Sequence, residues 1–297
     1  MANITFDELL EAGAHFGHLK RKWNPNMAPY IFMEKNGIHI IDLHKTIVKL
    51  DEATNSIRNI ARSGKKILFV ATKKQAKEII ADKVGDIGMP YVTERWFGGM
   101  LTNFPTIRKA VKKMSSIDKM EKDGTLDYMS KRERLQISRQ RMKLEKNLGS
   151  IIDLTRLPAA LFIVDVQKER NAVAEARRLN IPIFAIVDTN SNPNLVDYAI
   201  PANDDAAKSI ALILDHITAA IKEGLSERKV ERDKDDEDDE KKAPTKTRAR
   251  RTGPRAQAAA EDNESTEATT TTEPVEVTKP VEKVETVEDK EAEESAE

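Results

Sequence analysis

The sequence contains no cysteine, which excludes disulfide bonds and thiolate zinc sites. It also has no run of about 18 apolar residues, the length that a membrane-spanning helix requires. Residues 1–13, MANITFDELLEAG, lack the basic start and the apolar stretch of a secretory signal peptide. We therefore expect a cytoplasmic protein that has no membrane partner.

Aromatic residues are scarce, and several common binding motifs are missing. Only 5% of the residues are aromatic whereas 33% are charged, a balance more polar than that of an ordinary enzyme. The nucleotide signatures GxGxxG and GxxxxGK[ST] are absent, as are an RNA-recognition sheet motif, a KH loop and a zinc finger. A nucleotide-dependent enzyme is therefore disfavoured, and any RNA-binding surface should recognise shape and backbone, as in structured RNA.

Charge is divided unevenly along the chain. The whole sequence has a formal net charge of −1, but residues 226–297 hold 14 Lys and Arg against 23 Asp and Glu, a net charge of −9. Residues 1–225 keep the other 35 Lys and Arg and 27 Asp and Glu, a net charge of +8. A basic body with an acidic appendage predicts that the body binds a polyanion.

Continuous apolar runs followed by helical patterns predict a parallel sheet. KILFVA (residues 66–71), AALFIV (159–164) and IFAIV (183–187) are typical of strands that are buried on both faces. A helical pattern follows each run, and Thr72 should cap the first of these helices, which ends at Gly85. Because strands that alternate with helices imply right-handed crossovers, we expect a three-layer α/β/α domain with about five strands.

Two segments depart from this pattern. Asn36-Gly37 lies between two apolar runs and predicts a β-hairpin. Between residues 103 and 149, two helical stretches rich in Lys and Arg flank Lys122-Asp123-Gly124. They predict an inserted helical hairpin with arms about 30 Å long, which should project from the body.

The predicted domain boundaries follow from these patterns. We expect an α/β RNA-binding domain formed by residues 1–102 and 150–225, with the helical hairpin at residues 103–149 as an insertion. Residues 226–297 contain no Phe, Tyr, Trp, Leu or Ile, so they cannot bury enough apolar area to offset their ordering entropy. We predict that this tail is disordered.

The stretch from Gly13 to Tyr30, GAHFGHLKRKWNPNMAPY, concentrates cations, aromatic rings and helix breakers. Such a loop can bind phosphates and stack on bases. The alternative is an ordinary surface loop with solvated lysines, in which Trp23 packs on the core. The RNA-binding residues predicted here are Lys20, Arg21, Lys22, Trp23 and Asn24.

A second candidate is the stretch ERWFGGMLTN from Glu94 to Asn103, where twin glycines allow a partner to approach the backbone closely. The alternative is that Trp96 is buried at the base of the helical hairpin, and both interpretations can hold together. Lys73 and Lys74 could bind phosphate after the first buried strand, or they could be solvated lysines of a capped helix. The further predicted RNA-binding residues are Lys73, Lys74, Arg95, Trp96, Gly98, Gly99, Asn103 and Arg108.

Carboxylates at the ends of the predicted strands support a different hypothesis. Asp165, Asp188, Asp204 and Asp205 could serve a phosphate-handling enzyme or a phosphorelay module with a magnesium ion. The alternative is helix capping and turn formation. His18 with Asp188, Asp204 and Asp205 offers the ligand types of an incidental divalent ion. We predict no metal, cofactor or catalytic residue, because a fold by itself implies no activity.

Several long segments resemble the ribosomal protein S2 family of bacteria. They are LLEAGAHFGHLKRKWNPNMAPYIF, NGIHIIDL, KILFVATKKQA, ERWFGGMLTNF, PAALFIVDVQKERNAVAEARRLNIPIFAIVDTN and IPANDDA. The resemblance covers the chain from about Met1 to Leu225, and it implies a flavodoxin-like sheet domain with a protruding coiled-coil hairpin. The tail from Ser226 departs from the shorter common form of the family.

The resemblance also implies a function. It implies a non-enzymatic structural component of the small ribosomal subunit, which binds small-subunit rRNA on the solvent side at the junction of head and body. The implied partners are rRNA, neighbouring small-subunit proteins and ribosomal protein S1, which captures mRNA and whose docking such a protein supports. We expect no functional homo-oligomer.

Overall fold

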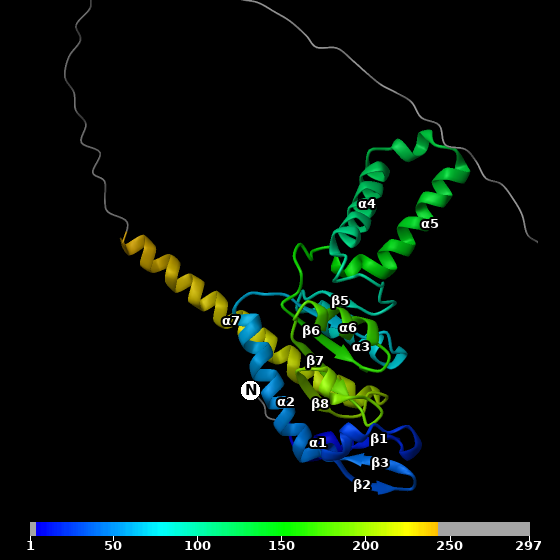
Figure 1. Ribbon diagram of the computed structural model, residues 1–297. Helices are drawn as coiled ribbons and strands as arrows, with labels where there is room; N and C mark the ends of the chain where they lie inside the picture. Colours follow the sequence, from blue (N-terminus) through cyan, green and yellow to red (C-terminus); the bar gives the residue numbers. More distant parts are fainter. Residues whose placement is uncertain (1–3, 243–297) are drawn as a thin grey trace, which may run out of the picture. The chain divides into compact units, whose positions relative to one another are not determined.

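A parallel sheet forms the centre of the computed structural model, which describes residues 4–242 (Figure 1). Its strand order is β5-β4-β6-β7-β8, and every neighbouring pair is parallel. In chain order this is 2-1-3-4-5, the flavodoxin-like order, so the predicted fold class is confirmed. The five strands are β4 (Ile67–Val70), β5 (Tyr91–Val92), β6 (Ala160–Val164), β7 (Ile183–Val187) and β8 (Tyr198–Pro201).

Helices cover both faces of the sheet. One face packs against α2 (Leu43–Arg62), α3 (Lys74–Gly85) and α7 (Ala207–Lys242). The other face packs against α6 (Arg170–Arg178) and the base of the helical insertion. The three layers of this arrangement are visible in Figure 1.

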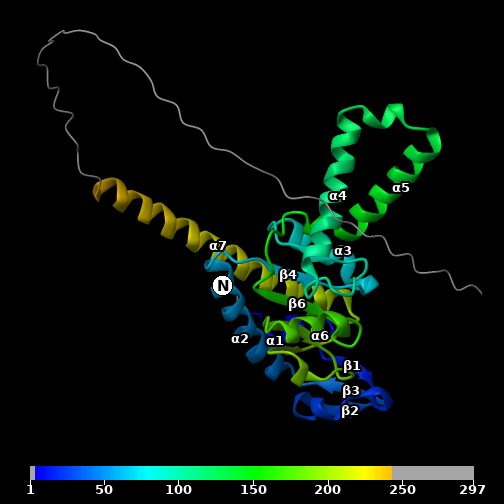
Figure 2. The same cartoon turned by 45° about the horizontal axis from the view of Figure 1, so that its top comes forward.

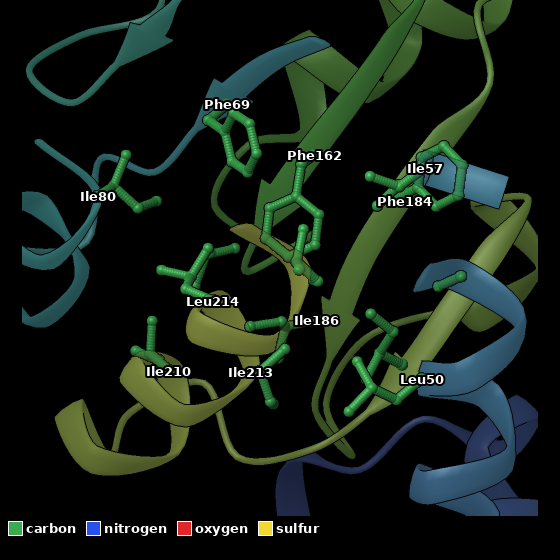
Figure 3. Packing of buried hydrophobic residues seen from close by; sticks show 14 of the residues in the cluster. Leu50, Ile57, Phe69, Ile80, Phe162, Phe184, Ile186, Ile210, Ile213 and Leu214 are labelled. Atoms are coloured by element: carbon green, nitrogen blue, oxygen red, sulfur yellow. The ribbon is translucent and has the colours of Figure 1, made fainter. Parts of the chain in front are cut away.

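The strands alternate between the two cores, as a pleated sheet requires. Phe69, Phe162 and Phe184 point to the core under α2, α3 and α7, and their close packing is shown in Figure 3. Leu68 and Ile163, one position along their strands, point to the other core. All the residues of β4, β6 and β7 are buried, which explains why these strands read as continuous apolar runs.

Helix α7 crosses α2 closely and continues beyond the sheet. A Cβ atom on Gly224 would lie 2.6 Å from the carbonyl oxygen of Arg58, so only glycine fits this crossing. Arg58 pairs with Glu227, and Arg62 pairs with Glu231, which extends the contact along both helices. The predicted tail is therefore helical as far as Lys242, and residues 243–297 lie outside the described residues.

A small antiparallel sheet precedes the main one. It has the order β1-β3-β2 and follows α1 (Phe6–Glu11), whose capping box is formed by Thr5 and Glu8. The turn between β2 and β3 is Asn36-Gly37, and both residues have positive φ. This is the predicted hairpin, and its φ values are those of the turn type that Asn-Gly favours. The strands are β1 (Phe16–Leu19), β2 (Ile31–Lys35) and β3 (Ile38–Ile41).

The insertion is a pair of helices, α4 (Phe104–Lys122) and α5 (Lys131–Leu148), which extend away from the sheet (Figures 1 and 2). Gly124 ends the first arm in the left-handed region at φ 69°. Val111 and Leu148 fix the base of the hairpin to the second core. Among the described residues no helix is long and apolar enough to cross a membrane.

Candidate nucleic-acid interface

The opening loop, defined here as residues 13–30, is attached to the loop that follows β7. The backbone N–H of Asn24 donates to the Thr189 carbonyl oxygen at 2.8 Å, and the N–H of His18 donates to Thr189 Oγ1 at 2.8 Å. A Cβ atom on Gly17 would lie 2.6 Å from Thr189 Cγ2, so the two segments are in close contact. Thr189 therefore positions the loop, although its sequence context gave no sign of this role.

The cations of the opening loop point to solvent. Lys20, Arg21 and Lys22 form a single 3-10 turn, η1 (Lys20–Lys22), and all three are exposed. Lys20 Nζ lies 2.7 Å from Glu34 Oε2, so Lys20 forms an ion pair with that carboxylate. Arg21 and Lys22 do not take part in this ion pair. This turn is short and open, so phosphates can reach it from outside.

The Trp23 ring is partly packed and partly exposed, so both interpretations made from the sequence apply to it. Its ring lies against the buried His39 ring, with 5.2 Å between the centroids. However, 38% of the residue is exposed, so part of the ring faces solvent. Asn24 is less available, because its side chain accepts a hydrogen bond from the Asn26 N–H at 2.9 Å. The packing and stacking interpretations of Trp23 therefore stay compatible.

Glu175 of α6 fixes the loop between β5 and α4. One carboxylate oxygen accepts from Trp96 Nε1 at 3.0 Å and from the Gly99 N–H at 2.8 Å. The other accepts from the N–H groups of Leu101 and Thr102 at 2.9 and 3.1 Å. Burial alone would raise the pKa of Glu175, but these hydrogen bonds outweigh it and lower the pKa below its usual range.

The hydrogen bonds to Glu175 change the interpretation of two predicted residues, Trp96 and Gly99. Trp96 is buried and its indole N–H is bonded, so its ring is not presented for stacking on a base. Gly99 adopts φ +85° and uses its N–H on Glu175, so its role in this loop is conformational. Arg95 and Gly98 are exposed and remain candidate contacts.

Two further predicted residues lie at the start of the hairpin. Asn103 is exposed, and its side-chain oxygen accepts from Thr106 Oγ1 at 2.8 Å. Arg108 is half-buried and donates to the Leu154 carbonyl oxygen at 2.8 Å, which ties α4 to the segment after α5. Asn103 is thus presented at the surface, whereas Arg108 also has a structural bond.

Lys73 is not a surface lysine, which corrects its assignment as a phosphate ligand. Its Nζ lies 2.7 Å from Asp204 Oδ1, 2.6 Å from Asp205 Oδ1 and 3.4 Å from Asp165 Oδ2. Burial alone would lower the pKa of Lys73, but the carboxylates outweigh burial and raise it. Lys74, the first residue of α3, is exposed and remains available.

Thr72 also differs from its predicted role as a helix cap. Its N–H and its hydroxyl both donate to Glu169 Oε1, with 3.0 Å for the N–H. Glu169 is buried, and burial raises the pKa of its carboxyl. Lys73 occupies the N-cap position of α3 without a side-chain cap, because the preceding threonine is bonded across the sheet edge.

A cluster of acidic side chains lies at the carboxyl ends of the strands. Because the strands are parallel, these ends lie along one edge of the sheet. Burial, together with the charges of Asp188 and Asp165, raises the pKa of Asp204 to about 7. Asp204 Oδ2 is buried and has no hydrogen-bond partner among the described residues. Three carboxylates of the cluster, those of Asp165, Asp204 and Asp205, therefore share the single ammonium group of Lys73.

His18 and two of these carboxylates form an arrangement that could hold a divalent cation. One ligand atom each from His18, Asp188 and Asp204 lies within 4.8 Å of the others. His18 Nδ1 lies 3.0 Å from Asp188 Oδ2, and this hydrogen bond raises the pKa of the imidazole. His18 Nε2 lies 3.5 Å from Asp205 Oδ2, which makes Asp205 a fourth nearby ligand. Imidazole and carboxylate are ligand types that zinc accepts.

The helical hairpin carries nearly all of the net positive charge of the body. Residues 104–148 hold 13 Lys and Arg against 6 Asp and Glu, a net charge of +7. The exposed Lys109, Lys112, Lys113 and Lys119 share one face of α4, because their spacing follows the helical period. The carboxylates of Asp118 and Glu145 both pair with Arg141.

A corresponding set of cations lies on α5. Arg132, Arg139 and Lys143 are exposed and repeat at intervals of seven and four residues, which places them on one helix face. The half-buried Ile137 and Leu144 lie on the opposite face, toward α4. These seven exposed cations of the two helices are therefore turned outward, away from the helix-helix contact.

We predict that Glu175→Gln lowers the free energy of unfolding by about 2–3 kcal/mol, because an amide cannot satisfy the same set of donors. Urea unfolding at pH 7 measures this loss. Glu175 has a lowered pKa in the folded state, so its contribution is present above pH ~4.3 and is lost as the pH falls through the folded value. The difference between the two proteins should therefore shrink in acid.

The matched control is Glu78→Gln on the exposed face of α3, which should change the unfolding free energy by less than about 0.5 kcal/mol. Equal stability of Glu175→Gln and the parent protein at pH 7 would contradict the role assigned to Glu175.

Although the sequence predicted no metal site, the fold brings His18, Asp188 and Asp204 together, and this cluster predicts that Zn²⁺ stabilises the protein. At a hundredfold excess over its Kd the ion should raise the Tm by about 5–10 °C, since it binds only the folded state. Asp188→Asn and His18→Gln should each abolish the shift, whereas the exposed His44→Gln should preserve it. Differential scanning fluorimetry measures all four proteins, and an identical shift in all of them would rule out this site.

Comparison with known proteins places the chain in a family. The family model for Ribosomal protein S2 matches residues 9–224. The small ribosomal subunit protein uS2 of Parabacteroides distasonis is 70% identical over 232 residues, which are 78% of this chain and 84% of that protein. The uS2 of Azobacteroides pseudotrichonymphae is 69% identical over 241 residues, 81% and 92% of the two chains. The chain belongs to the ribosomal protein S2 family.

Proposed function

We propose that this protein binds small-subunit rRNA through the outward faces of its helical hairpin and through the opening loop. As a member of the ribosomal protein S2 family it is a structural constituent of the small ribosomal subunit, and so acts on ribosomes in the bacterial cytoplasm. The observation that carries the proposal is the net charge of +7 on residues 104–148, with seven exposed cations of α4 and α5 turned away from the helix-helix contact. Such surfaces bind phosphates with little dependence on base sequence.

The hairpin is suited to contacts at a distance from the sheet. Each arm has 18 or 19 residues, and at 1.5 Å per residue is roughly 27–29 Å long. Cations spaced along both arms can meet the phosphates of folded RNA at several points at once. This reach supports a place between two parts of the subunit, and we propose the solvent side of the head-body junction.

The opening loop supplies a second set of RNA contacts. Arg21, Lys22 and the exposed part of Trp23 are held in place by the attachment of the loop to Thr189. Arg95 and Lys74 are exposed in segments that follow β5 and β4, so they lie toward the same edge of the sheet. These contacts would help to dock the globular part of the protein during subunit assembly.

We also propose that the protein supports docking of ribosomal protein S1, and through it the recruitment of mRNA. The supporting observation is an apolar groove of about 450 Å³ formed by α1, β1, β2 and the start of α2. Phe32 is 69% exposed, and Phe6, Phe16 and Met33 are also exposed beside it. An uncovered group of large apolar side chains is a common mark of a protein-binding surface.

The alternative hypothesis, a phosphate-handling enzyme or phosphorelay module, is not supported. The chain belongs to a family of structural ribosomal proteins rather than to one of enzymes. The strand-end carboxylates are also engaged in the interior, where Lys73 bridges Asp165, Asp204 and Asp205. Their arrangement fits the support of the sheet edge and of the opening loop.

The basic face of α4 gives a direct test of RNA binding. Replacing Lys109, Lys112 and Lys113 by Gln should reduce the slope of log K against log salt by about 2, because each phosphate contact contributes about 0.7–0.9. Fluorescence anisotropy with small-subunit rRNA fragments measures the slope. The same variant should be incorporated less efficiently into small subunits during reconstitution, as measured by sedimentation.

A control triple replaces the exposed Lys65, Arg178 and Lys208 by Gln, which removes the same charge outside the proposed interface. Its salt slope should stay within about 0.5 of the parent value if three specific contacts produce the main effect. Equal slopes for the two triples would reject the hairpin as the interface. Failure of the parent protein to sediment with small subunits would reject the proposed function itself.

The apolar groove predicts a separable effect on ribosomal protein S1. Phe32→Ala should reduce the retention of S1 on purified small subunits by more than about tenfold, because central aromatic residues often dominate a protein interface. The rRNA affinity of the variant should be unchanged. Val48→Ala, which truncates an exposed apolar residue of α2, is the control, and a Phe32→Ala subunit that retains S1 normally would contradict this part of the proposal.

A further inference from the structure

The contact between α4 and α5 changes character along the hairpin. Near the base it is apolar, since Val111 of α4 and Leu148 of α5 are buried in the second core. Met114 and Ile117 continue this buried row along α4 toward the tip. Along α5 the inward positions at helical spacing are 148, 144, 141, 137 and 134, which are Leu, Leu, Arg, Ile and Arg. Arginine at positions 141 and 134 interrupts the apolar contact as the helices approach the tip.

The interruption leaves a groove between the two helices near the tip. Its volume is about 600 Å³, within the roughly 300–1,000 Å³ range of ligand sites. Ile117, Leu126 and Leu135 supply apolar walls, whereas Lys131, Arg134 and Ser138 supply charged and polar groups. Figures 1 and 2 show the tip segment that joins α4 and α5 at the end of the hairpin away from the sheet.

The tip also presents an uncovered aromatic ring. Tyr128 ends the 3-10 turn η3 (Thr125–Tyr128), the same turn that supplies Leu126 to the groove. It is 93% exposed, the largest exposed fraction among the large apolar and aromatic side chains of the described residues. A ring held this far into solvent gains nothing from the core, so its apolar area is available to a partner.

We propose that the groove and Tyr128 bind an unstacked nucleotide of a single-stranded rRNA loop, an inference that rests on the proposed rRNA-binding function. The base would stack on the Tyr128 ring or lie against Leu135 in the groove, and the adjoining phosphate would lie against Lys131. An exposed aromatic ring and an apolar wall beside cations are the combination that suits single-stranded RNA. The outward basic faces of the hairpin, in contrast, suit the backbone of double-stranded RNA.

Charge favours RNA over a protein partner at this site. The groove is lined by three cations, Lys131, Arg134 and Arg141, against one carboxylate, Glu121. Arg141 also pairs with Asp118 and Glu145, so the local excess of positive charge is moderate and lies on the α5 side. An occupant with one or two negative charges and a flat apolar body is complementary to these walls, and a nucleotide has this chemistry.

The test compares single-stranded and double-stranded RNA binding by the full chain. The probes are a fluorescein-labelled 10-nucleotide single strand of mixed sequence and a 16-base-pair RNA duplex. Tyr128→Ala and Leu135→Ser should each weaken single-strand binding by about fivefold to twentyfold, since one stacked base contributes this much. Duplex binding should change by less than about twofold, and the salt slope should be unchanged because no cation is removed.

Met142→Ser is the matched control, because Met142 is an exposed apolar residue of α5 that does not line the groove. It should bind both probes as the parent protein does. Single-strand affinity that is unaltered in Tyr128→Ala and Leu135→Ser would overturn the inference, and so would an equal loss for both probes.

A second measurement places the contact in the assembled subunit. Short-wavelength ultraviolet cross-linking of small subunits, followed by mass spectrometry, should join the Tyr128 peptide to an rRNA nucleotide. A Tyr128 peptide without a nucleotide adduct, in subunits where other peptides of the protein carry one, would overturn the inference. The lysine triple on α4 separates the two proposals. Normal RNA binding by this triple rejects the hairpin as the interface. Normal single-strand binding by the tip variants alone rejects only the groove.

Discussion

The burial of the parallel sheet on both faces is the constraint on which the rest of this structure depends. With α2, α3 and α7 on one side and α6 with the hairpin base on the other, no strand of the sheet has a solvated face to offer. Ligand contacts must therefore come from segments beyond the strand ends. Because all five strands are parallel, the segments that follow them meet at a shared edge. The opening loop is attached to that edge through Thr189, and the insertion begins after the strand β5.

Buried and exposed charged groups of this protein form different kinds of interaction. Glu175 is an internal carboxylate whose charge is stabilised by the backbone and indole N–H groups around it, and these groups lower its pKa. Asp204 is an internal carboxylate whose charge is opposed by burial and by its acidic neighbours, which raise its pKa to about 7. The seven outward cations of the hairpin are external and solvated. Their charge therefore stays available for a polyanion, as a phosphate-binding surface requires.

The strength of the sequence predictions varied with the kind of signal. The three apolar runs identified β4, β6 and β7 because their residues are buried on both faces, and Asn36-Gly37 identified its hairpin because few turns accept two positive φ values. The short edge strands β5 and β8 were not located, since β5 has only two residues and each strand includes half-buried positions instead of a continuous buried run. Residue assignments depend on burial and pairing in space, which the sequence does not record. Lys73 and Trp96 resemble surface ligands in the sequence, but both side chains are bonded in the interior.

What the sequence determined by itself were the properties that are local or additive. These are the helical and strand periods, the turn at Asn36-Gly37, the basic charge of residues 1–225 and the concentration of that charge between residues 104 and 148. Tertiary structure alone decided which polar groups are used internally. Glu175 meets the loop of Gly99, and His18 meets Asp188 and Asp204, across separations of 76 or more residues. The reason is physical: a side chain is exposed or paired according to its neighbours in space, and the parallel topology brings together neighbours that no local pattern records.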